Sequence, residues 1–203
     1  MIRKFRGVAL LLGVAALTLP AKAQNSNPLS ADVAATYTVE KSKIASVDCG
    51  CFWFQGGSLD AAVPLFRGLG AAAVLTGEHS SNIAPGVDLG KIAFMMGPRY
   101  SFDPTRWIRR LPRIRRGSGF FGEALFGAAH GFDSSFPGSA GVFGSENALS
   151  MQFGGGLNIR LARGLGVRAI ELDYVRTTFR NLASDSQNDF RLAFGVTYHV
   201  GGR

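Results

Sequence analysis

Three adjacent residues, Glu78, His79 and Ser80, are an acid, a base and a nucleophile of the kinds that hydrolases use. Consecutive side chains on an extended chain point to opposite faces, which makes a proton relay among these three geometrically unfavourable. We interpret them as the polar end of a strand and predict no catalytic residue. A lipid-modifying enzyme with its site at this position is the less favoured alternative.

A glycine-rich segment, residues 117–122 (GSGFFG), has the spacing of a dinucleotide-binding fingerprint. That fingerprint requires a preceding strand and a following helix, whereas this segment opens an alternating, strand-like stretch. The match is therefore a chance one. His130 and His199 each stand without an obvious partner, so the sequence predicts no cofactor and no metal site.

Residues 106–116 (RWIRRLPRIRR) combine six arginines with apolar residues at helical spacing, interrupted by Pro112. Such a mixture suits the headgroup layer of a membrane, where anionic lipid attracts each arginine by about 1 kcal/mol. We expect this segment to lie along a membrane surface; an ordinary solvated basic turn is the alternative. The residues assigned to it are Arg106, Trp107, Arg109, Arg110, Arg113, Arg115 and Arg116.

The pattern that must position these groups is clearest near the end of the chain, in residues 190–200 (FRLAFGVTYHV). Even positions are apolar and odd positions are polar or small, which predicts a β-strand with one apolar face. The alternation recurs about eight times along the chain, and the segments are joined alternately by long polar loops and by mostly tight turns. The long loops are expected at residues 41–57, 79–88, 131–146 and 180–189.

The N-terminus has the form of a secretory signal peptide. A basic head is followed by an apolar run over residues 8–19 and by Ala21-Lys22-Ala23, a small-x-small cleavage signal. We expect a signal peptide over residues 1–23, a flexible leader over 24–31 and a barrel domain over 32–203. Cleavage would remove four cations and lower the formal net charge from +8 to +4. No later apolar run is long enough for a membrane-spanning helix.

The polar face of the strands identifies the expected interior. Charged groups can pair with one another inside a narrow barrel, whereas the same groups facing lipid would be costly. A soluble lipocalin-like binder would instead turn its apolar face inward, around a ligand. The pattern predicts an all-β protein, an eight-stranded antiparallel up-and-down transmembrane β-barrel. Its expected interior charge network is Asp60, Lys91, Arg99, Glu123, Arg160, Glu171, Asp173 and Arg191.

The signal peptide, the eight-strand pattern and the terminal strand over residues 190–200 resemble the outer-membrane β-barrel proteins of the OmpA-like porin family. The resemblance covers the mature chain and implies a location in the cell outer membrane. Members of that family often end on an aromatic residue, whereas Gly201-Gly202-Arg203 follow the last strand here. The resemblance is to the barrel alone, and no peptidoglycan-binding domain is expected after it.

The sequence favours a structural function, with a role in envelope interactions. Narrow porin-like passage of water or small solutes is the alternative. We expect outer-membrane lipid as a partner, and the barrel-assembly machinery and periplasmic chaperones during biogenesis. Nucleic acid is not expected as a partner of an exported barrel. The sequence names no surface ligand.

The two cysteines, Cys49 and Cys51, flank Gly50 in the first predicted outer loop. Export exposes the chain to an oxidising compartment, and the glycine eases the strain of so small a ring. We predict a disulfide that staples the loop; an intermolecular disulfide or a metal site that recruits further ligands are the alternatives. Mass spectrometry of the unreduced monomer should detect no free thiol, and two free thiols would contradict the staple.

Overall fold

The computed structural model describes residues 30–43, 51–84, 87–102, 118–138, 141–180 and 185–201. The expected signal peptide lies outside these residues. No helix within them is long and apolar enough to span a membrane. The described chain forms eight strands: β1 (Ala31–Lys43), β2 (Cys51–Phe66), β3 (Leu69–Ala84), β4 (Val87–Phe102), β5 (Gly119–Gly138), β6 (Gly141–Arg160), β7 (Leu165–Thr177) and β8 (Gln187–Val200).

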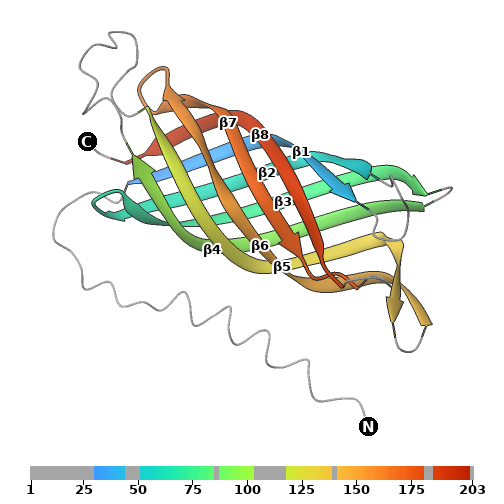
Figure 1. Ribbon diagram of the computed structural model, residues 1–203. Helices are drawn as coiled ribbons and strands as arrows, with labels where there is room; N and C mark the ends of the chain where they lie inside the picture. The colour runs from blue at the N-terminus through green and yellow to red at the C-terminus, as the bar shows by residue number, and fades with distance from the viewer. Residues whose placement is uncertain are drawn as a thin grey trace. The chain divides into compact units, whose positions relative to one another are not determined.

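The strands form a closed antiparallel barrel in which each strand pairs with its neighbours in the sequence (Figure 1). Closure occurs between β1 and β8, whose register runs from Ala31↔Val200 to Lys41↔Phe190. The β1–β8 pairing therefore leaves neither terminal strand with a free edge along the barrel wall, which removes the exposed hydrogen-bonding groups of an open sheet. The predicted fold class is confirmed.

Three of the predicted long loops are wrong over much of their length. β2 already begins at Cys51, β3 continues to Ala84, and β5 pairs with β6 as far as Gly138↔Gly141. Figure 1 shows the β5–β6 hairpin running on beyond the ends of its neighbours. Polar and glycine-rich composition indicated loops here, but the backbone hydrogen bonds of a hairpin do not require an apolar face.

The two faces of the barrel wall differ sharply in chemistry. On β8 the even-numbered apolar side chains from Phe190 to Val200 are 39–69% exposed on the outside. Arg191 and Ala193, between them, are buried inside. The same division holds on the other strands, where Leu59, Phe94 and further large apolar side chains face outward. The exterior is thus apolar and the interior rich in charge, the reverse of a water-soluble protein.

Part of the interior is apolar as well. Met95 and Leu125 are completely buried, and Val74 and Phe179 belong to the same cluster. An eight-stranded barrel is just wide enough for side chains to fill, and these residues fill it at their level. Val74, Met95 and Leu125 occupy inward positions on β3, β4 and β5, and Phe179 follows the end of β7.

A tight turn between β2 and β3 illustrates the connections at the end where β1 begins. Phe66 pairs with Leu69, so only Arg67 and Gly68 form the loop. Both have positive φ values, 47° and 89°. That geometry is a type I′ turn, whose twist matches that of the flanking strands.

The apolar interior cluster should contribute measurably to stability. Leu125→Ala removes a completely buried side chain and should lower the free energy of unfolding by roughly 2–5 kcal/mol. Urea titration of the refolded barrel, followed by tryptophan fluorescence, measures the change. A loss below about 1 kcal/mol would mean that the cluster is loosely packed.

Candidate functional site: the buried charge network

Eleven charged side chains are buried in the described part of the chain, seven carboxylates and four cations. Each is at most 7% exposed. Charges in so enclosed an environment are tolerated only when they are paired and hydrogen-bonded. The carboxylates are Glu40, Asp60, Glu78, Glu123, Glu171, Asp173 and Asp189, and the cations are Lys91, Arg99, Arg168 and Arg191.

Two arginines share one aspartate in the part of the network nearest the β2–β3 turn. Asp60 Oδ2 lies 2.6 Å from Arg99 Nη2 and 2.7 Å from Arg168 Nη1. The ring centroid of Phe121 lies 4.5 Å from the central carbon of each guanidinium group. Cation–π contacts with this one ring help to accommodate both cations. Arg168 Nη1 also contacts Glu171 Oε2 at 2.9 Å.

A second group of contacts surrounds Lys91. Its ammonium forms ion pairs with Glu40 and with Glu78, the latter at 3.0 Å. The ring of Phe54 lies 4.8 Å from the same nitrogen. Two carboxylates therefore pair with one lysine.

Arg191 connects the two regions. Its Nε and Nη2 atoms donate to Asp173 Oδ2 at 3.2 and 3.0 Å, and its Nη1 donates to Thr76 Oγ1 at 3.2 Å. Asp173 is on the adjacent strand β7, whereas Thr76 is on β3, which does not pair with β8. The arginine therefore reaches across the interior.

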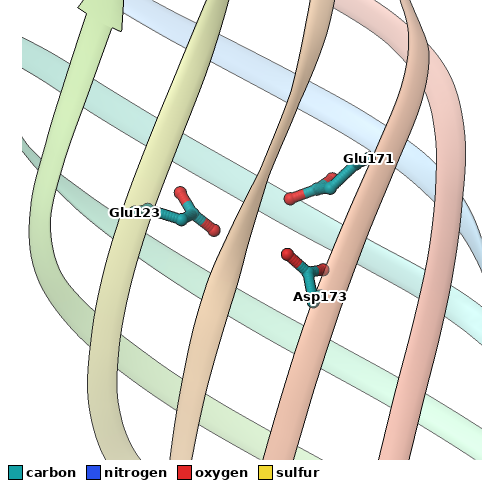
Figure 2. Close-up of side chains that lie close together, drawn as sticks. All are labelled: Glu123, Glu171 and Asp173. Atoms are coloured by element: carbon teal, nitrogen blue, oxygen red, sulfur yellow. The ribbon is translucent and has the colours of Figure 1, made fainter.

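Three carboxylates converge beside these arginines. Glu123 extends from β5, and Glu171 and Asp173 extend from β7, on either side of β6 (Figure 2). Ligand oxygens of the three lie within 4.8 Å of one another. The strand between them carries Gly154, which pairs with both Glu123 and Asp173. A Cβ atom on Gly154 would lie 2.1 Å from Asp173 Oδ1, so the absence of a side chain there leaves room for the carboxylate.

Seven of the eight residues expected in the interior network lie in it, and Arg160 does not. Arg160 is half-buried and lines a cavity of about 160 Å³ at the end of the barrel where β1 begins. Its backbone N–H donates to Ser118 Oγ at 2.9 Å. No ion pair of its guanidinium occurs within the described ranges. The same cavity is lined by Asp32 and His199, which contact each other at 2.7 Å.

Arg168 takes the place in the network that Arg160 was expected to have. Strict alternation from Ile170 and Leu172 would turn Arg168 outward. The pairing of β7 shifts register between Arg168 and Glu171, and Ala169 and Ile170 are both exposed. This β-bulge reverses the facing of the strand and brings Arg168 inside. The sequence around Ala169 and Ile170 contains no signal strong enough to predict the bulge.

Glu40, Glu78 and Asp189 were missed for a different reason. Glu40 and Asp189 have inward parity, but each lies one residue outside a strand expected from the alternation, and Asp189 falls in an expected loop. Glu78 was considered only as part of a catalytic group. In the structure Glu78 and Ser80 point inward and His79 points outward, and this alternation separates the three side chains. One more residue at the strand end includes Glu40 and Asp189. Glu78 already ends the strand expected over residues 69–78, whose many alanines leave its facing open.

The remaining sequence-predicted residues are only partly described. Cys51 is exposed at the start of β2, and Cys49 lies outside the described residues, so the disulfide stays a prediction. The basic segment Arg106, Trp107, Arg109, Arg110, Arg113, Arg115 and Arg116 also lies outside them.

Comparisons with known proteins bear on the fold. No protein-family model matches the chain, and no curated protein matches it. Among solved structures, Ail, the attachment invasion locus protein of Yersinia pestis, is 15% identical, with a TM-score of 0.52 over 85% of this chain and 99% of that one. Neisserial surface protein A is 12% identical, with a TM-score of 0.54 over 84% and 96% of the two chains. The chain has the eight-stranded fold of the OmpA-like outer-membrane barrels. At these identities the likeness establishes the fold alone and does not define the role of the charge network.

Arg191 gives a direct test of the network. Arg191→Met leaves Asp173 buried without its ion-pair partner and should lower the free energy of unfolding by about 3–5 kcal/mol. Arg180→Met is the matched control, because Arg180 is 62% exposed in its pair with Glu146 and should change stability by no more than about 1 kcal/mol. Equal effects of the two substitutions in urea unfolding would show that burial adds nothing to the pair.

Proposed function

We propose that this chain is an integral outer-membrane β-barrel protein with a structural role and a role in envelope interactions. The observation that carries the proposal is the inverted distribution of side chains, with apolar groups outside and charges inside. In water such an apolar exterior would drive association. In a bilayer the same exterior faces lipid, where it is favourable. In the described part of the chain, seven carboxylates and four cations are buried inside, where a lipocalin would have an apolar ligand cavity.

A filled interior supports a structural role over solute passage. Arg99, Phe121 and Arg168 are packed together, and Met95 and Leu125 are completely buried farther along the barrel. A path for water or solutes would require these side chains to move. Planar-bilayer recordings of the purified barrel should show no steady single-channel conductance, and a reproducible conductance would favour the narrow-passage alternative.

The expected location and partners follow from the same proposal. Export through a cleaved signal peptide, periplasmic chaperones and the barrel-assembly machinery would bring the chain to the outer membrane. The arginine-rich segment would then lie along the periplasmic surface of the outer membrane and contact anionic headgroups. Replacement of its arginines by alanine should weaken binding to anionic liposomes. We propose no enzymatic activity.

Surface contact is the envelope role that the structural neighbours suggest. Ail is named for attachment and invasion, and it has also been solved in complex with the heparin analogue sucrose octasulfate; that structure is 16% identical, with a TM-score of 0.51 over 85% of this chain and 99% of that one. In this chain the β5–β6 hairpin projects beyond the other strands at the opposite end from the chain termini of the barrel (Figure 1). We propose this end as the surface that meets partners outside the cell.

The membrane location makes a depth-dependent prediction. Leu172, in the middle of β7, is 59% exposed, and Leu65, next to the β2–β3 turn, is 68% exposed. In a bilayer Leu172→Arg should cost about 2–4 kcal/mol of folding free energy, and Leu65→Arg only about 0–1 kcal/mol. Urea unfolding in lipid vesicles measures both. If the two substitutions cost the same, the exterior does not face hydrocarbon.

A further inference from the structure

We propose that Glu123, Glu171 and Asp173 form an interior binding site for a hard cation of the size of Ca²⁺. The three carboxylates come from β5 and β7 and meet over β6 (Figure 2). The proposal concerns the interior of the barrel and holds whatever the outer end of the protein contacts. Oxygen ligands of this kind are those that hard cations prefer.

The spacing of the oxygens is compatible with a cation of the size of Ca²⁺. Ligand atoms of the three carboxylates lie within 4.8 Å of one another. Two oxygens on opposite sides of Ca²⁺, each at 2.3–2.6 Å, are roughly 4.6–5.2 Å apart, whereas around Mg²⁺ they are only about 4.0–4.2 Å apart. The cluster is therefore wide enough for an ion of the size of Ca²⁺.

Unsatisfied oxygens at the cluster are an observation independent of its acidity. Asp173 Oδ1 is buried and accepts no hydrogen bond within the described residues, and its side chain is completely enclosed. The same holds for Oε1 of Gln152, a completely buried residue whose Nε2 donates to Glu123 Oε1 at 2.8 Å. A buried oxygen without a donor is costly, and a cation satisfies it.

The position of Asp173 Oδ1 shows that it is directed toward the cluster. Arg191 bonds only the other oxygen, Oδ2. Oδ1 lies over Gly154, the residue of β6 that separates Asp173 from Glu123. The free oxygen thus occupies the space that the glycine leaves open between the two acids.

The arginines do not neutralise this part of the barrel. Each bonds one oxygen of a cluster member: Arg99 bonds Glu123 Oε2, Arg168 bonds Glu171 Oε2 and Arg191 bonds Asp173 Oδ2. Asp60 also pairs with Arg99 and Arg168. Four carboxylates therefore share three guanidinium groups here. When all four are ionised, a bound cation compensates the one negative charge that the arginines leave.

The experiment loads the ion while the barrel forms. The full mature chain is refolded in detergent with calcium chloride, free ion is removed by gel filtration, and bound calcium is measured by atomic emission. We expect about one calcium per barrel in the wild type and at least tenfold less in the double variant Glu171→Gln/Asp173→Asn. The amides keep the size of the side chains and can still accept hydrogen bonds from the arginines.

A control variant distinguishes an effect specific to the cluster from the effect of removing any buried charge. Glu78→Gln removes an equally buried carboxylate beside Lys91 and should retain the calcium of the wild type. Circular dichroism verifies that each variant folds, and Glu123→Gln replaces the double variant if that one does not. Failure of the wild type to retain calcium, or equal retention by the cluster variants, would overturn the proposal.

Discussion

The need to pair charges across a narrow interior is the constraint on which the rest of this barrel depends. Arg99 on β4 and Arg168 on β7 both contact Asp60 on β2, and Lys91 on β4 contacts Glu40 on β1. None of these pairs joins neighbouring strands. The ion pairs therefore connect opposite parts of the wall, which the ladder of backbone hydrogen bonds does not. An interior wider than the reach of these side chains would leave the charges unpaired.

The same constraint explains the small residues and aromatic rings among the charges. Gly154 allows carboxylates from β5 and β7 to approach over β6, and Phe121 contacts both of the guanidinium groups that share one aspartate. Outside, the apolar side chains have no comparable requirement of position, because lipid accepts any of them. Specificity in this fold is therefore concentrated on the inner face, and the outer face must only remain apolar.

The alternation of residues allowed the fold class and the facing of most strands to be predicted from the sequence. An alternation with a period of two residues can be recognised without knowing which strands pair. It is sufficient to predict the inward facing of Asp60, Lys91 and Arg191. Arg168 could not be placed in this way, because the β-bulge that turns it inward depends on the register of two neighbouring strands. Glu40 and Asp189 were missed because strand ends are set by hairpin pairing, which continues through polar sequence.

The most direct test of the central claim is the gel mobility of the mature chain refolded in detergent, with and without boiling. A closed barrel whose apolar wall binds detergent should resist unfolding by the gel detergent and migrate differently until it is boiled. Circular dichroism of the unboiled sample should be of the β type. No change in mobility, together with solubility after detergent removal, would contradict the account, since the apolar face would then have to lie inside.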